Sequence, residues 1–213
     1  MKACSSCGAE SPDGPAPKTG SAAEDAVVAA ALDYVRALFS GDAGGHDPSH
    51  TLRVYRCALR IASREGGADR QIVALAALLH DADDHKLFAT EGNANARRFL
   101  TAQGLASDRI ERVCAAINEV SFSRNRGKRP STPEAAIVQD ADRLDALGAV
   151  GVARTFAYGG AHGRPMEDSL AHFRDKLLLL RGELNTDAAR ELATPRHAFL
   201  EQFLAAYARE TEE

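Results

Sequence analysis

Residues 70–81 read RQIVALAALLHD, and eight consecutive apolar residues in this segment lead directly into His80 and Asp81. The alanine and leucine content favours a helix over a strand. Because the segment is apolar on every side, we predict a helix buried at the centre of the protein. His80 and Asp81 would then stand where this helix leaves the core. A carboxylate in such a place needs a compensating partner, which can be a metal ion, an arginine or a helix N-terminus.

Helical periodicity continues over the chain from about residue 22 onward. Apolar side chains recur at steps of three and four in 22–40 and 49–65, and glycines follow both segments. The triplet Asn185-Thr186-Asp187 supplies an N-cap for the last helix. We predict an all-α protein, a helical bundle in a single domain, with a polar loop at 123–133. The expected helices cover 22–40, 49–65, 70–80, 91–103, 108–119, 134–147, 148–158, 168–181 and 187–209.

Residues 1–20 differ in composition from the rest, because they are rich in small residues and proline and almost lack bulky apolar side chains. Such a segment buries too little surface to offset the cost of ordering, so we predict a disordered tail before a domain at 21–213. Cys4 and Cys7 form one Cys-x-x-Cys pair, whereas a structural zinc site usually takes two such pairs. Since Cys57 and Cys114 stand alone, we interpret the tail cysteines as free thiols.

The bulk composition argues against several classes of protein. The net charge of −4 lacks the basic excess of a general nucleic-acid binder. No apolar run is long enough to cross a bilayer, and the first residues have no hydrophobic signal core. Four cysteines in 213 residues do not make a disulfide scaffold. We therefore expect a cytoplasmic protein that binds neither nucleic acid nor membrane.

A second histidine lies on an inward face of the helix predicted at 49–65. His50 shares a stripe with Val54, Cys57 and Ile61, so it is either a hydrogen-bonded core histidine or a ligand. His46 and Asp47 precede it at the helix entry. Asp47 can cap the helix or orient the imidazole of His50.

Three aspartates interrupt the otherwise apolar helix predicted at 134–147. Asp142 and Asp145 share one face at a spacing of three, while Asp140 points elsewhere. Acids in such a helix need a purpose, which can be a metal or a salt bridge with Arg143 or Arg154. Together, His50, His80, Asp81 and Asp142 offer two imidazoles and two carboxylates.

These segments resemble the HD-domain metal-dependent phosphohydrolases, specifically a bacterial-type subgroup of small, single-domain, nucleotide pyrophosphohydrolase-like proteins. The resemblance covers roughly residues 25–210 and rests on several motifs rather than on one. One departure is that the subgroup usually has aromatic residues where Pro48 and Ser49 stand here. The motifs read HDPSHTLRV at 46–54, AALLHDADDHK at 76–86, VQDADRLDALGA at 138–149, RTFAYGG at 154–160 and HFRDKLL at 172–178.

The resemblance implies one divalent metal ion with His50, His80, Asp81 and Asp142 as its ligands. Mixed nitrogen and oxygen ligands suit Mn, Ni, Co, Fe or Mg better than a closed thiolate zinc site. Four protein ligands on a six-coordinate ion leave positions for a water and a phosphate oxygen.

Catalytic and substrate-binding roles follow from the same resemblance. Asp84 lies four residues after His80, and some members, such as alarmone hydrolases, have an acid there that assists the attacking water. If the chain there stays helical, Asp84 projects toward the metal, and we interpret it as a general base or water-orienting residue. The alternative is a solvated acidic turn with Asp83. Lys86 is a candidate for catalysis and for phosphate binding.

Further groups could bind the substrate. Arg53 and Lys176 are candidates for binding phosphate oxygens. Tyr158 can stack on a base or sugar, or pack in the core. The loop at 124–129 carries four positive charges in six residues and is either a clamp for a polyphosphate or a solvated surface loop.

The resemblance points to hydrolysis of a small-molecule nucleotide, with a (deoxy)nucleoside triphosphate cut to monophosphate and pyrophosphate as the preferred reaction. A 5′-nucleotidase or other phosphomonoesterase is the nearest rival. Alarmone hydrolysis fits less well, because the acidic pair of those enzymes reads Asp84-His85 here. Two further candidates are a catalytically silent nucleotide-sensing HD module and a di-iron oxygenase, which needs more histidine ligands. The sequence leaves open whether the chain forms a homodimer.

Overall fold

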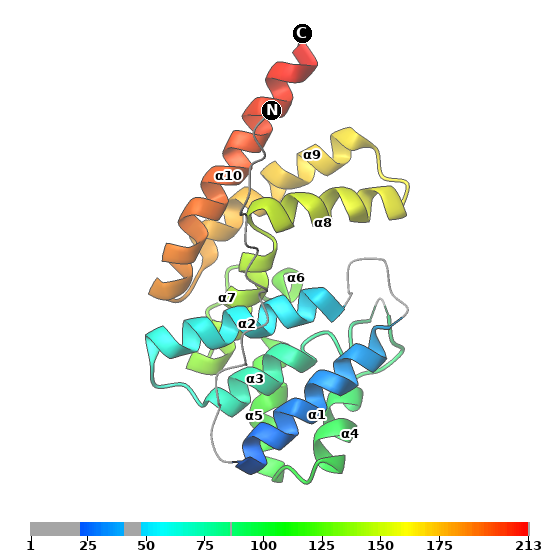
Figure 1. Cartoon of the computed structure of the whole chain (residues 1–213), viewed down its shortest axis with the longest axis vertical. Helices are drawn as coiled ribbons and strands as arrows, with labels where there is room; N and C mark the ends of the chain where they lie inside the picture. The colour runs from blue at the N-terminus through cyan, green and yellow to red at the C-terminus, as the bar shows by residue number, and fades with distance from the viewer. Residues whose placement is uncertain (1–21, 41–47, 86, 213) are drawn as a thin grey trace, which may run out of the picture.

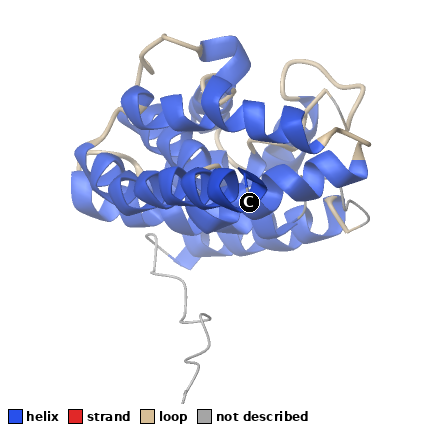
Figure 2. Cartoon of the chain, turned by 90° about the horizontal axis from the view of Figure 1, so that it is seen from above, coloured by secondary structure: helices blue, strands red, loops and turns tan. Residues whose placement is uncertain are grey.

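The computed structural model describes residues 22–40, 48–85 and 87–212, and within these ranges the chain forms helices and loops with no strand (Figure 2). The all-α prediction is therefore confirmed. The predicted tail with Cys4 and Cys7 lies outside the described residues, as do His46, Asp47 and Lys86.

The predicted central helix is α3 (Arg70–Leu79), which is buried from Gln71 to Leu79. Four helices pack around it (Figure 1). Because a helix that is apolar on every side must be covered on every side, this arrangement follows from the composition of 72–79. The surrounding helices are α1 (Ala22–Leu38), α2 (Pro48–Glu65), α5 (Ser107–Asn118) and α7 (Pro133–Asp145).

The start of α3 is held by the carboxylate of Asp69. It accepts hydrogen bonds from the backbone N–H groups of Gln71 and Ile72 at 3.1 and 3.2 Å. Arg109 lies 3.0 Å from the same carboxylate and Arg112 3.4 Å from it. Burial raises the pKa of Asp69, but the hydrogen bonds from Ile72 and Arg109 outweigh it, so the pKa lies below its ordinary value. The N-cap therefore also ties α3 to α5.

The remaining elements correct two predicted boundaries. The helix expected from residue 91 begins at α4 (Ala94–Ala102), because Gly92 and Asn93 before it adopt positive φ angles of 64° and 59°. The prediction of a single helix over 168–181 is wrong. Helix α9 (Met166–Asp175) ends at Asp175, and a separate 3₁₀ segment, η1 (Leu177–Glu183), follows it. Leu177 and Leu180 of η1 are both buried, and their spacing of three suits a 3₁₀ helix.

The end of the bundle above α2 and α7 is formed by α8 (Gly148–Ala161), α9, η1 and α10 (Asp187–Glu212) (Figure 1). A short helix, α6 (Phe122–Asn125), overlaps the start of the segment predicted as a polar loop at 123–133. Helix α10 is in contact with both α7 and α8. The site described below lies between these two parts of the bundle.

Asp140 connects α7 to the start of α10. Its buried carboxylate accepts hydrogen bonds from the backbone N–H groups of Asn185 at 2.9 Å and Thr186 at 2.8 Å, and from the Thr186 hydroxyl at 2.8 Å. The Thr186 hydroxyl oxygen in turn accepts from the N–H of Ala189 at 3.3 Å, as expected for the predicted cap. Asp140 thus points away from Asp142, as the helical spacing predicted.

Replacing Asp69 with asparagine should lower the free energy of unfolding by about 1 kcal/mol at neutral pH, because the cap oxygen stays but the charge facing Arg109 and Arg112 is lost. A carboxyl group whose pKa is depressed in the folded state stabilises the protein above its unfolded pKa of about 3.9, and this stability is lost as the pH falls through the folded pKa. The difference in unfolding free energy between wild type and Asp69→Asn, measured by urea unfolding, should therefore begin to shrink near about pH 4 and disappear only below the folded-state pKa of Asp69, which lies under its ordinary value.

Asp33→Asn is the matched control, since Asp33 is 81% exposed and forms its ion pair with Arg36 within the same helix. It should change stability by less than about 0.5 kcal/mol at any pH. A difference between wild type and Asp69→Asn that stays constant with pH would contradict the assigned role of the carboxylate.

Candidate metal centre

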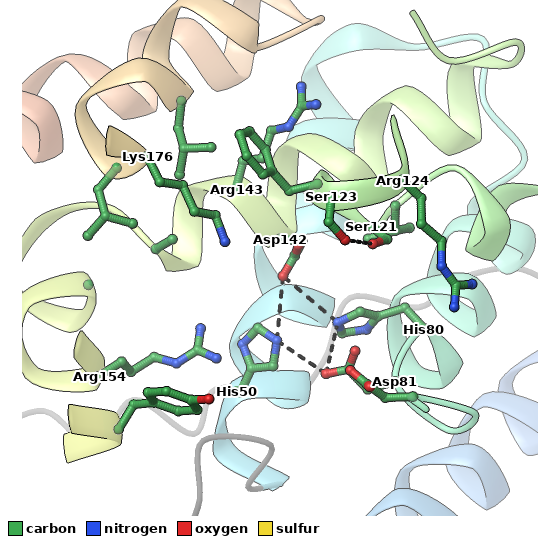
Figure 3. Close-up of a pocket in the computed structure, with 18 of the residues that line it drawn as sticks. His50, His80, Asp81, Ser121, Ser123, Arg124, Asp142, Arg143, Arg154 and Lys176 are labelled. Atoms are coloured by element: carbon green, nitrogen blue, oxygen red, sulfur yellow. Dashed lines mark hydrogen bonds and ion pairs between the residues drawn. The ribbon is translucent and has the colours of Figure 1, made fainter. Parts of the chain in front are cut away.

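Three segments that are distant in sequence bring four donor groups to one point (Figure 3). His50 is the third residue of α2, and Asp142 lies in α7. His80 and Asp81 follow the last residue of α3, where the apolar helix leaves the core. The imidazoles are both 3% exposed, whereas Asp81 and Asp142 are 14% and 27% exposed. The carboxylates therefore face a cavity and the imidazoles form its floor.

Ligand atoms of His50, His80 and Asp142 all lie within 4.8 Å of one another, and Asp81 approaches the two imidazoles of this group. His50 Nε2 lies 3.5 Å from both Asp81 Oδ2 and Asp142 Oδ1. His80 Nε2 lies 3.4 Å from Asp81 Oδ2 and 3.9 Å from Asp142 Oδ1. Two donors bound to one ion at about 2.1 Å can be at most about 4.2 Å apart. All four separations satisfy this limit.

The other nitrogen of each imidazole determines what its Nε2 presents. His80 Nδ1 lies 2.9 Å from the carbonyl oxygen of Ala77, which can only accept, so Nδ1 carries the proton. His50 Nδ1 lies 2.8 Å from Asp145 Oδ2 and donates to it. Each Nε2 then directs a lone pair toward the two carboxylates. Two lone pairs and two carboxylates repel one another unless a cation lies between them, so the donor set fits a divalent metal ion.

Asp145 supports this arrangement from behind His50. Its Oδ1 accepts from Arg53 Nε at 2.7 Å, and its Oδ2 accepts from Arg154 at 2.7 Å and from His50. Burial raises the pKa of Asp145, but the hydrogen bonds from His50 and Arg53 and the charge of Arg154 hold it well below its usual range. A permanently ionised acceptor fixes the tautomer of His50.

The predicted salt bridge with Arg154 is thus present, and it involves Asp145. Arg143 instead lies 3.5 Å from the carboxylate of Glu183 and donates to its backbone carbonyl. From the sequence, Asp47 was the candidate for orienting His50. Among the described residues, Asp145 performs this function, and its spacing of three from Asp142 was the only signal for it.

A cavity of about 460 Å³ opens above the four donors. In Figure 3, Lys176 and Arg154 point into it from one side, and Arg124 lies on the other. Its described lining includes five basic side chains (Arg124, Arg143, Arg154, Arg164 and Lys176) and four acidic ones (Asp81, Asp83, Asp84 and Asp142).

Asp84 lines the cavity, although the helical continuation that would have brought it there is wrong. The chain does not stay helical after His80 but forms turns, and these turns carry Asp84 to the cavity wall. Asp83 has a different role, since its carboxylate accepts from the backbone N–H groups of Asn95 at 2.9 Å and Ala96 at 3.1 Å at the start of α4. The two adjacent acids therefore act on different parts of the structure.

The remaining residues predicted to bind the substrate do not all line the same cavity. Lys176 and Tyr158 line the cavity, with Lys176 Nζ 5.0 Å from the centre of the Phe122 ring. The ring of Tyr158 stacks on His162, with centroids 3.9 Å apart. Arg53 is not part of the lining, because its guanidinium group binds Asp145 and faces a second cavity.

Arg164 and His172 also line the cavity. The sequence analysis assigned a role to neither of them, although His172 begins the motif at 172–178. Burial and the charges of Lys176 and Arg164 hold the pKa of His172 below its ordinary value, so this imidazole is neutral at neutral pH. No spacing rule linked either residue to the donors, because both come from the far end of the bundle.

Comparison with known proteins identifies the family. The HD domain model matches residues 49–147. The chain is 42% identical to the uncharacterized protein YpgQ of Bacillus subtilis over 180 residues, which are 80% of this chain and 87% of that protein. The crystal structure of YpgQ in complex with ADP is similar with a TM-score of 0.73 and 38% identity, covering 84% of this chain and 97% of that one. An HD-superfamily hydrolase from Bacillus thuringiensis gives a TM-score of 0.73 and 37% identity over 89% and 98% of the two chains.

The chain belongs to the HD-domain family and is a metal-dependent hydrolase of that superfamily. The predicted resemblance is thereby confirmed. The matched residues 49–147 include His50, His80, Asp81, Asp142 and Asp145. Among the described residues, every helix is too short or too polar to span a bilayer.

Replacing Asp145 with asparagine should weaken Mn²⁺ binding by about 10- to 100-fold, because the neutral amide is a weaker acceptor for His50 Nδ1–H and can turn its NH₂ group toward the imidazole. Mn²⁺ titration followed by electron paramagnetic resonance measures this directly. Asp187→Asn removes a charge of the same sign that is 87% exposed and serves as the control. Unchanged affinity in Asp145→Asn would contradict the supporting role of this carboxylate.

Proposed function

We propose that the protein is a nucleotide phosphohydrolase that cuts a (deoxy)nucleoside triphosphate to monophosphate and pyrophosphate, with His50, His80, Asp81 and Asp142 as ligands of one divalent ion. The observation that carries the proposal is the cluster of His50, His80 and Asp142, with Asp81 beside the two imidazoles, at the floor of a cavity with a basic wall. The similarity to YpgQ, whose structure was solved with ADP, supports a nucleotide as the ligand.

The size and charge of the cavity support a polyphosphate substrate. Its volume of about 460 Å³ lies within the usual range for small-molecule sites. The basic side chains outnumber the acidic ones by one within the described lining, and a divalent ion would widen this difference. Substrate phosphates are therefore favoured over neutral esters, because the site is positively charged when it is loaded.

Within this cavity, Lys176 and Arg154 are the groups that bind and orient the phosphates, because both point into it from one side (Figure 3). Arg124 approaches from the other side and holds the distal end of the polyphosphate chain. Charge-assisted hydrogen bonds from these groups stabilise the leaving pyrophosphate. Arg124 is the first residue of the basic segment at 124–129, and the clamp role is proposed for Arg124 alone, because Arg126, Lys128 and Arg129 are exposed and outside the cavity lining.

A divalent ion bound here supplies Lewis acidity and lowers the pKa of a coordinated water. The carboxylate of Asp84 is the proposed acceptor of the proton from the attacking water, because it lines the same cavity without being one of the four donors. Lys86 remains a proposed catalytic and phosphate-binding residue from the sequence. Tyr158 is proposed to bind the base or sugar through its ring edge, since one ring face contacts His162.

Purified protein with Mn²⁺ should hydrolyse one or more members of a panel of nucleoside mono-, di- and triphosphates, releasing pyrophosphate from triphosphates. Chromatography of the nucleotide products, with separate assays for phosphate and pyrophosphate, identifies the bond that is cut. Chelation of the metal should abolish turnover, and so should His50→Ala or Asp81→Ala, because each removes a ligand.

The outcomes separate the candidate functions. Release of phosphate from monophosphates would replace the proposed reaction with that of a 5′-nucleotidase. A nucleotide-dependent rise in melting temperature without any product would support a silent sensing module. Full activity in His50→Ala would disprove the assigned metal site.

Asp84→Asn should lower kcat by about 10²- to 10⁴-fold, because an amide cannot accept the proton of the attacking water. Its Mn²⁺ affinity should stay close to that of wild type, since Asp84 is not among the four donors. Asp83→Asn is the neighbouring control: it should weaken the start of α4 and lower the melting temperature while leaving kcat close to wild type. Equal kcat values for Asp84→Asn and wild type would remove Asp84 from the mechanism.

A further inference from the structure

The cavity above the metal donors has a polar wall where α5 ends and α6 begins. Four side chains of this region line the cavity, and we call them the distal wall: Asn118, Ser121, Ser123 and Arg124. In Figure 3, the two serines and Arg124 lie on the opposite side of Asp142 from Lys176. Apart from Arg124, the distal wall consists of neutral groups that can donate hydrogen bonds, namely two hydroxyls and one amide.

The amide of Asn118 is oriented by Asn93. The Nδ2 atom of Asn93 lies 3.4 Å from the backbone carbonyl oxygen of Cys114, which can only accept, so Asn93 donates there. The same Nδ2 atom donates its other hydrogen to Asn118 Oδ1 at 3.0 Å. The Nδ2 group of Asn118 has no acceptor among the described residues, so its two N–H donors are available at the cavity surface.

The backbone beneath the distal wall is held by a second amide. Asn125 Nδ2 donates to the backbone carbonyl oxygens of Asn118 at 3.0 Å and of Ser121 at 3.1 Å. The hydroxyl oxygens of Ser121 and Ser123 lie 3.2 Å apart, so one hydroxyl donates to the other, whose own hydrogen stays available to a ligand. Because these hydrogen bonds hold the donors in place in advance, binding a ligand costs less conformational entropy.

Arg124 adds a positive charge to this wall. Two other arginines of the cavity lining are in ion pairs, Arg143 with Glu183 and Arg154 with Asp145. Arg124 forms no ion pair or hydrogen bond with another residue in the part of the chain that the structure describes. Its guanidinium group can therefore bind an anionic ligand without first leaving a carboxylate.

We propose that the distal wall binds the terminal phosphate of a nucleoside triphosphate, and that Asn118, Ser121 and Ser123 thereby determine how many phosphates the site prefers. Hydroxyl, amide and guanidinium groups are common donors to phosphate oxygens. An anion that contacts both the distal wall and Lys176, with the metal donors between them, must be longer than a single phosphate group. This assignment rests on the proposed function and adds three residues that select the triphosphate over shorter nucleotides.

The test is isothermal titration of the full chain, with Mn²⁺ present, using the α,β-methylene analogues of ATP and ADP. These probes differ only in the terminal phosphate, and carbon replaces the oxygen of the bond that the proposed reaction cuts. Wild type is compared with Ser121→Ala/Ser123→Ala and with Asn118→Asp, which keeps an oxygen for Asn93 but replaces the N–H donors with a negative charge. The control, Gln202→Glu, adds the same charge at an exposed position of α10 outside both cavities.

We expect wild type to bind the ATP analogue about tenfold more tightly than the ADP analogue. Each distal-wall variant should lose about tenfold in affinity for the ATP analogue and less than about twofold for the ADP analogue, because only the longer chain reaches the lost donors. The control should match wild type.

Three results would overturn the assignment. One is a wild type that binds neither analogue or binds both equally well. Another is a pair of distal-wall variants that behave like wild type or lose affinity for both analogues alike. The third is an equal loss in Gln202→Glu. Because binding rather than turnover is measured, failure of the proposed nucleotide hydrolysis would not change these outcomes.

Discussion

The hydrogen bond between His50 and Asp145 is the interaction on which the site depends. It joins α2 to α7 across 95 residues of sequence at a distance of 2.8 Å. It places the proton of His50 on Nδ1 and leaves the lone pair of Nε2 facing Asp81 and Asp142. His50, Arg53 and Arg154 hold the pKa of Asp145 well below its usual range, so its carboxylate remains an acceptor for His50 Nδ1. The arrangement of the proposed metal ligands therefore depends on this one buried carboxylate.

The packing of helices around α3 brings α2 and α7 together, and with them His50 and Asp145. The helices that carry His50 and Asp142 are two of the four that pack around α3, so burial of the apolar segment 72–79 also brings the donors to its end. His80 and Asp81 emerge where the apolar run stops. Core packing and site geometry therefore have the same origin, and the cavity lies where α3 ends and the helices α8 and α9 begin to cover it.

The sequence predicted the all-α class, the central helix and a donor set that the structure brings together. These features follow from composition and local spacing, which a single chain displays directly. What it did not predict depends on contacts between distant segments. The pairing of Arg53 with Asp145 and the placement of Arg164 and His172 belong to this class. Helix α9 ends at Asp175 because the buried leucines that follow it pack as a 3₁₀ segment. The chain turns after His80 because the carboxylate of Asp83 caps the start of α4, and these turns bring Asp84 to the cavity.

A crystal structure of the full chain with Mn²⁺, analysed by anomalous scattering, tests the central claim most directly. We predict one strong anomalous peak per chain, within bonding distance of His50 Nε2, His80 Nε2 and carboxylate oxygens of Asp81 and Asp142. His50 Nδ1 should remain hydrogen-bonded to Asp145. Mn²⁺ bound elsewhere, or bound without His50, would contradict the assigned metal centre.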